Sequence, residues 1–215
     1  MTTAPETPPA LTATVLSCSL RRSSSPSSSE QLGRELAAAM DRHAPGGVHA
    51  TVVRVVDHDV RFGVSVDEGD GDGWPALRRL VLGSDILVLA VPIWMGQTSS
   101  VAKMVLERLD AEISETDDEG RPLMHGKVAA IAVVGNEDGA HHVVATCAQA
   151  LNDVGFSIAA NGCTYWVGEA MHGTDYRDLP NGSEQTTNAT EMAARATVHL
   201  AALLKAHPYP APEGS

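Results

Sequence analysis

A dense run of hydroxyl side chains occupies residues 17–29, which read SCSLRRSSSPSSS. The run lies between a short β-branched segment and a segment with helical spacing, so it is expected to lead into the N-terminus of a helix. That position offers unpaired backbone N–H groups, and neighbouring hydroxyls and a guanidinium complete a site for a phosphate. The candidate phosphate-binding residues are Ser19, Arg21, Ser27, Ser28 and Ser29.

This serine-rich run lacks the motifs of polyphosphate sites. It contains neither GxGxxG nor GK[ST], so a single terminal phosphate fits better than ATP or a pyrophosphate. A flexible serine linker has the same composition and is the alternative interpretation. The place of the run in the chain favours the phosphate site, because doubly wound sheets bind ligands at this loop.

A second stretch, PIWMGQTS, follows a continuous apolar segment. Its apolar side chains can form a wall for a flat aromatic ligand, and its glycine lets the backbone approach that ligand closely. Trp94 can equally be a packed core residue, so both interpretations stay open. The candidate ligand-binding residues here are Pro92, Ile93, Trp94, Met95, Gly96 and Gln97.

A third stretch, GNEDGAHH, also follows an apolar segment. Such a turn can present N–H groups to the edge of a ring, and either histidine can donate to it. Adjacent histidines also suggest a metal site, but on a helix they point about 100° apart, and no third ligand has suitable spacing. A helix cap with solvated histidines is the simpler alternative. The candidates are Gly135, Asn136, Glu137, Asp138, Gly139 and His142.

Strand-like and helix-like segments alternate along the chain, and they must position these three stretches. The clearest strand is DILVLAV, an apolar run typical of a parallel strand buried on both faces. Strands are expected at 11–18, 49–56, 85–91, 127–134 and 156–162. Helices are expected at 30–43, 74–82, 141–154, after Ser99 or Ser100, and around 192–203.

Five strands separated by helices predict an α/β fold, because parallel neighbours need helical crossovers on both faces of the sheet. We expect a flavodoxin-like three-layer α/β/α arrangement with a five-stranded parallel sheet of order 2-1-3-4-5. In that order the first, third and fourth loops meet at one ligand crevice. A single domain over 10–206 is expected, with flexible tails at 1–9 and 207–215.

The charge balance excludes some classes of partner. Fifteen Lys and Arg against 27 Asp and Glu give a net charge of −12, which disfavours nucleic acid and anionic membranes. Three widely separated cysteines suggest neither disulfides nor structural zinc, and for Cys18 a buried packing role is preferred over a redox role. The start, MTTAPETPP, lacks the features of a signal peptide, and no apolar run approaches a membrane span of about 20 residues. We expect a cytoplasmic protein.

Three quoted segments carry a family resemblance: SLRRSSSPSSS, PIWMGQTSSVAKMVLERLD and VVGNEDGAHHVVATCAQALNDVGF. Together they resemble the NADPH-dependent FMN reductase group of flavodoxin-like proteins, over roughly residues 13–167. The resemblance implies that the loop 19–29 holds the FMN phosphate. It also implies that 92–97 lies along the isoalloxazine and that 135–139 closes the other side of the ring. Cys18 stands where the family usually has glycine, and extra serines with Pro26 lengthen the loop.

The resulting hypothesis is an FMN-binding oxidoreductase that passes hydride from NADH or NADPH to a quinone, flavin or other small acceptor. Because the flavin carries the chemistry, no catalytic side chain is assigned. The alternatives are a flavodoxin-type electron carrier serving a protein partner and a flavin-free scaffold. A homodimer or homotetramer is expected, partly from the resemblance and partly to cover an apolar patch at the flavin edge.

Overall fold

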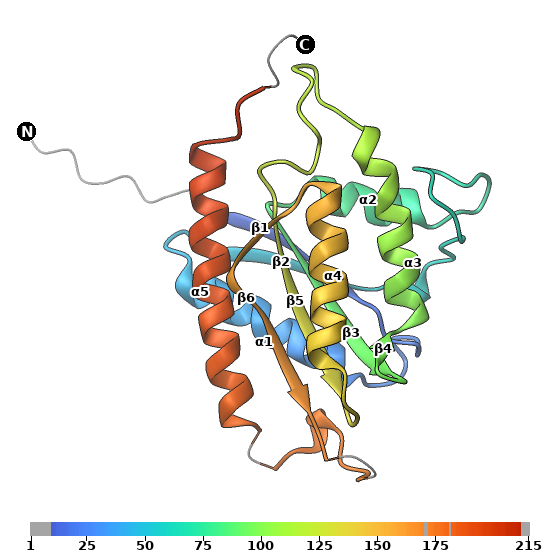
Figure 1. The fold of residues 1–215 in the computed structure, drawn as a ribbon, viewed down its shortest axis with the longest axis vertical. Coiled ribbons are helices and arrows are strands. Elements are labelled where there is room, and N and C mark those ends of the chain that lie inside the picture. Colours follow the sequence, from blue (N-terminus) through green and yellow to red (C-terminus); the bar gives the residue numbers. More distant parts are fainter. Residues whose placement is uncertain (1–9, 170–171, 181, 212–215) are drawn as a thin grey trace, which may run out of the picture.

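A computed structural model describes residues 10–169, 172–180 and 182–211. Its centre is a sheet of five long parallel strands in the spatial order β2-β1-β3-β5-β6 (Figure 1). Counted along the chain, these strands have the expected order 2-1-3-4-5, so the predicted fold class is confirmed. The strands are β1 (Leu11–Ser17), β2 (Val48–Arg54), β3 (Ile86–Trp94), β5 (Val128–Gly135) and β6 (Ser157–Val167). A two-residue strand, β4 (Gln97–Thr98), pairs antiparallel with the end of β3.

In the described residues, five α-helices cover the two faces of this sheet. Two pack on one face, α1 (Ser28–His43) and α5 (Glu184–Ala206), and the buried apolar residues there form one core. Three pack on the other face over a second core, namely α2 (Trp74–Leu82), α3 (Ser100–Leu109) and α4 (Ala140–Val154). Short 3-10 helices occur at Val55–Asp57, Asp110–Ser114 and Tyr176–Asp178. The layers follow from β3 and β5, which are apolar along their length and buried on both faces.

Serine side chains begin three of the helices. Ser27, Ser99 and Ser183 each accept a hydrogen bond from the N–H group three residues later, at 3.2–3.3 Å. Each of these bonds pairs an N–H group that the first turn of a helix leaves without a backbone partner. The helices α1 and α3 therefore begin directly after the loops that follow β1 and β3.

The strand β6 is longer than the sequence pattern predicts. It continues to Val167, so Tyr165 and Trp166 lie within the strand rather than beyond its end, which corrects the expected boundary. The expected end at 162 falls on an irregularity, where Asn161 has a φ of 54° and the pairing register with β5 shifts. Asn161 and Gly162 look like a turn in the sequence, but here they form a bulge after which pairing resumes.

The parallel register brings the carboxyl ends of the strands to one edge. Ser17 pairs with Ala90, and Gly135 at the end of β5 pairs with Val167 at the end of β6. The loops after β1, β3, β5 and β6 therefore gather at the lower end of the molecule in Figure 1. Among the helices described, none is both long enough and apolar enough to span a membrane.

Candidate functional site

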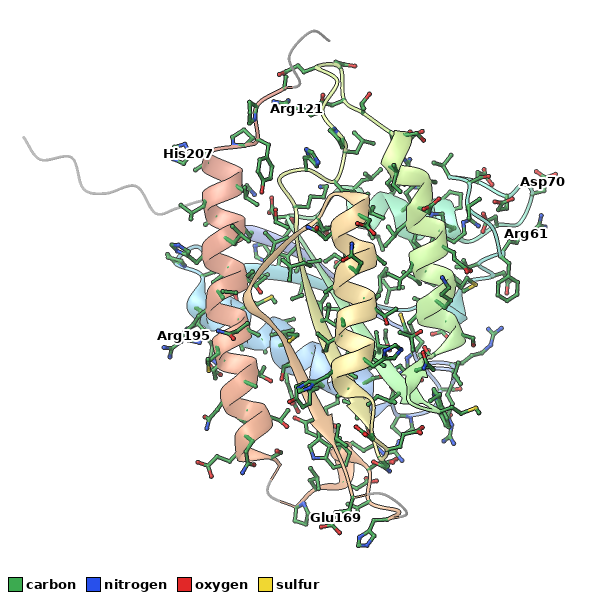
Figure 2. The ribbon with its side chains drawn as sticks, viewed as in Figure 1. Arg61, Asp70, Arg121, Glu169, Arg195 and His207 are labelled. Carbon is green, nitrogen blue, oxygen red and sulfur yellow. The ribbon has the colours of Figure 1, made fainter. Side chains whose placement is uncertain are left out.

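A cavity of about 330 Å³ lies at the carboxyl edge of the sheet. This volume is at the lower end of the range of small-molecule sites. Figure 2 labels Glu169 at this end of the molecule, directly after β6, with Arg121 and His207 at the opposite end. The cavity is lined from the loops after β1, β3, β5 and β6 by Ser19, Leu20, Arg21, Pro26, Ser27, Ser28, Ser29, Pro92, Ile93, Trp94, Val134, Gly135, Asn136, Glu137, Asp175 and Arg177.

One end of the cavity is the N-terminus of α1. The N–H groups of Ser28 and Ser29 in its first turn make no hydrogen bond within the described part of the chain. Hydroxyls surround them, since the Ser29 Oγ lies 3.1 Å from the Ser27 Oγ, and the Ser19 Oγ accepts from the Arg21 N–H at 3.2 Å. Unpaired amides at the positive end of a helix dipole, with hydroxyl donors beside them, fit a terminal phosphate.

Arg54 anchors the loop that leads into α1. This arginine is the last residue of β2 and is only 6% exposed. Its guanidinium donates to the carbonyl oxygens of Arg21, Arg22 and Ser25 at 2.8, 3.0 and 3.2 Å. It also donates to the Glu30 carboxylate at 2.6 Å. Three of these bonds hold the loop in a defined shape and the fourth ties Arg54 to α1, which contradicts the flexible-linker interpretation of the serine run.

The Glu30 carboxyl group stays ionised opposite Arg54. Burial raises the pKa of Glu30, but hydrogen bonds from Arg54 and Arg34 outweigh that effect and hold the pKa below its ordinary value. Arg54 was not a predicted site residue. The only signal for it in the sequence is one arginine within the otherwise β-branched and apolar run TVVRVV.

The loops after β3 and β5 form a single wall on the other side of the cavity. The Glu137 carboxylate accepts hydrogen bonds from the N–H groups of Met95 at 2.8 Å and Gly96 at 3.2 Å. Gly139 packs against Gly96 so closely that a Cβ on Gly139 would stand 2.7 Å from the Gly96 carbonyl oxygen. The two loops, predicted from the resemblance to flank a ring on two sides, are therefore joined to each other.

Eleven of the predicted residues line the cavity, and six do not. The six are Met95, Gly96, Gln97, Asp138, Gly139 and His142. Three of them make contacts between the two loops instead, because the Glu137 carboxylate accepts from the N–H groups of Met95 and Gly96, and Gly139 packs on Gly96. His142 adds to this link, with its Nε2 2.8 Å from the Gln97 Oε1. Trp94 is 52% exposed and lines the cavity, so the interpretation of Trp94 as a core residue is wrong.

The segment after β6 contributes two polar lining residues that the sequence pattern did not indicate. Asp175 accepts a hydrogen bond from the Asn136 Nδ2 at 3.1 Å, and Arg177 donates from Nη1 to the Pro26 carbonyl at 3.1 Å. This segment therefore connects the loop after β5 to the loop before α1. Leu20, Pro26 and Val134 are the further lining residues that sequence reasoning missed.

The three thiols are shielded from solvent to different degrees. Cys18 and Cys147 are buried, and Cys163 is half-buried. Burial raises the pKa of each thiol, to about 12 for Cys147. Cys18, at the start of the serine-rich loop, is therefore a protonated packing residue. In the described residues, no cluster of three or more His, Cys, Asp or Glu side chains could hold a metal ion.

The parallel sheet of order β2-β1-β3-β5-β6, with helices on both faces and a cavity at its carboxyl edge, defines a protein of the flavodoxin-like class. The NADPH-dependent FMN reductase family matches residues 11–172, and the chain belongs to that family. The resemblance drawn from the three sequence segments is therefore confirmed. FMN is accordingly the cofactor, with NADH or NADPH as the co-substrate.

Two named relatives are each 34% identical to this chain. One is the 8-demethyl-8-aminoriboflavin-5'-phosphate synthase of Streptomyces davaonensis, aligned over 93% of this chain and 80% of the synthase. The other is the divalent metal cation transporter MntH of Mycobacterium bovis, aligned over 91% of this chain but only 29% of the transporter. Among solved structures, RosB with its bound intermediate 8-demethyl-8-formylriboflavin-5'-phosphate matches with a TM-score of 0.81 at 32% identity. That match covers 93% of this chain and 82% of RosB.

Proposed function

We propose that this chain is an NAD(P)H-dependent oxidoreductase that holds FMN in the cavity at the carboxyl edge and serves a quinone, a flavin or another small acceptor. One observation carries the proposal: a single cavity joins the unpaired N–H groups of Ser28 and Ser29 to the half-exposed side chain of Trp94. The first feature suits a terminal phosphate and the second suits a flat ring. When bound, FMN supplies the hydride and electron chemistry.

The side chains of this site have binding and orienting roles in the proposal. Ser27 and Ser29 offer hydroxyls to the phosphate, and hydrogen bonds from Arg54 to the loop carbonyls fix the conformation of their loop. Ile93 and Trp94 present apolar surface to the ring. Glu137 fixes the backbone of that wall, which removes the entropy cost of ordering it when the ligand binds.

An assay without any protein partner tests the proposed reaction. The purified chain is loaded with FMN and mixed with NADH or NADPH, with and without a soluble quinone. We expect steady consumption of NAD(P)H that depends on the quinone and on FMN. Consumption only after a redox protein is added would instead support the electron-carrier alternative.

A second candidate function follows from the relatives that act on or bind riboflavin 5'-phosphate derivatives. In this candidate the flavin phosphate is a substrate modified on its ring rather than a recycled cofactor. The two functions differ in the fate of the flavin. Mass spectrometry after many turnovers detects unaltered FMN in the first case and a flavin phosphate of changed mass in the second.

The wall of the cavity also supports a proposed assembly. Met95 is 90% exposed and adjoins Trp94, so two large apolar side chains face solvent beside the cavity. We propose that a homodimer or homotetramer covers them. Light scattering at micromolar concentration checks this, and a Met95→Lys variant is expected to shift the wild-type assembly towards monomer.

A further inference from the structure

The 3-10 helix Tyr176–Asp178 is held against the first two turns of α1. The Tyr176 ring is buried and lies 5.6 Å from the Trp166 ring, and its hydroxyl donates to the Glu35 carboxylate at 2.5 Å. The next residue, Arg177, has its backbone N–H 3.5 Å from the Ser28 Oγ. The buried tyrosine therefore fixes the backbone of Arg177 beside the N-terminus of α1.

Arg177 lines the cavity, and its guanidinium does not use all of its donors. Its Nη1 donates to the Pro26 carbonyl, its Nη2 lies 3.3 Å from Asp175, and its Nε lies 3.4 Å from Asp178. These two ion pairs are longer than the 2.7–2.9 Å of a strong charge-assisted bond. A guanidinium has five N–H donors, so three contacts leave two donors for a ligand.

The second cation of the cavity is held differently. Arg21 is exposed, and its side chain makes no hydrogen bond or ion pair within the part of the chain that the structure describes. Ordering such a side chain on a ligand costs rotamer entropy, whereas Arg177 is already placed by Pro26 and its two aspartates. Arg177 is thus the pre-organised cation beside the unpaired amides of α1.

We infer that Arg177 recognises the terminal phosphate of the flavin, as a binding residue contributed by the segment after β6. The inference rests on the proposed function, because it requires the flavin in this cavity with its phosphate at the N-terminus of α1. The inferred phosphate site then combines the serine-rich loop with a second segment that lies far away in the sequence. The site then distinguishes FMN from riboflavin by a guanidinium as well as by backbone amides.

The test compares two ligands that differ only in the phosphate. FMN and riboflavin are each titrated into the apo-protein, with quenching of flavin fluorescence as the readout, for wild type, Arg177→Gln and Arg177→Lys. We expect Arg177→Gln to raise the Kd for FMN about 10-fold to 100-fold, as for a lost charge-assisted hydrogen bond, and to leave the Kd for riboflavin unchanged. Arg177→Lys should recover part of the FMN affinity.

The matched control is Arg195→Gln on α5, an exposed arginine outside the cavity lining that changes the net charge equally. It should alter neither Kd. Equal losses for FMN and riboflavin in Arg177→Gln would mean that Arg177 only supports the fold of the segment, and they would overturn the inference. An unchanged Kd for FMN would overturn it as well, while leaving the proposed function standing. A wild-type chain that binds neither flavin would refute the proposed function itself.

Discussion

The guanidinium of Arg54 and the carboxylate of Glu30 meet at 2.6 Å beneath the serine-rich loop. Arg54→Met removes this pair and the three bonds to loop carbonyls. We expect the free energy of unfolding of the apo-protein to fall by about 3 kcal/mol. This value is at the low end of the cost of breaking a buried ion pair, because the Glu30 carboxylate keeps its ion pair with Arg34. Urea unfolding measures this. Arg34→Met removes only an exposed pair and should cost about 1 kcal/mol or less, so equal costs would contradict the anchoring role.

The same pair makes the stability depend on pH in the acid range. Because the pKa of Glu30 is lowered in the folded state, its contribution is complete above the ordinary glutamate pKa and is lost as the pH falls through the lowered folded value. The stability difference between wild type and Glu30→Gln should therefore be constant near neutral pH and shrink below about pH 4. Urea unfolding at a series of pH values measures it. A stability difference that grows towards low pH would contradict this prediction, because it would mean that folding raises the pKa of Glu30.

The contact between the loops after β3 and β5 predicts an unusually costly glycine substitution. At Gly139, with φ of +121°, an added Cβ meets the Gly96 backbone at 2.7–2.9 Å. Gly126 also has positive φ, +86°, but an added Cβ there meets nothing within 4 Å. Gly126→Ala should cost only the backbone strain, about 1–2 kcal/mol, and Gly139→Ala about 1–3 kcal/mol more from the clash. Chemical denaturation of the two variants checks this, and equal costs would refute the close packing.

Two tryptophans separate ligand contact from core packing. Trp94 is half-exposed in the cavity wall, whereas Trp74 is fully buried. Trp94→Ala should change the stability of the apo-protein by less than about 1 kcal/mol but weaken FMN binding by about 1–3 kcal/mol, by analogy with bases stacked on aromatic side chains. Trp74→Ala should cost about 3–5 kcal/mol of stability. Thermal melts of the apo-proteins beside FMN titrations measure both. An unaltered affinity of Trp94→Ala for FMN would contradict the proposal that the flavin ring lies against this wall.

The sequence predicted the order of the elements well, because strands buried on both faces give unmistakable apolar runs. The helix Trp74–Leu82 has the expected bounds, and most other boundaries lie within two residues of the expectation. The end of β6 was missed because Asn161 and Gly162 have the composition of a turn, and only pairing with β5 reveals that they form a bulge. Local pattern cannot report such pairing.

The site was predicted only where its residues lie at the carboxyl ends of strands β1, β3 and β5 or directly after them. The stretches 17–29, 92–97 and 135–142 could be identified because turn residues near the ends of apolar runs mark the carboxyl edge, although 92–94 still belong to β3. Arg54 and Arg177 could not be identified, because one lies within a strand and the other in a segment without periodicity. The hydrogen bond from the Met95 N–H to the Glu137 carboxylate could not be foreseen either, since it joins residues 42 positions apart.

The burial of the thiols has a consequence for the proposed acceptors. Quinones are electrophiles that alkylate thiolates, and a thiolate near the site of their reduction would be consumed during turnover. Burial raises the pKa of all three thiols, including Cys18 at the start of the serine-rich loop, so each is kept in the less nucleophilic thiol form. If the chain reduces quinones as proposed, we expect this burial to protect Cys18 and Cys147 from covalent modification during turnover.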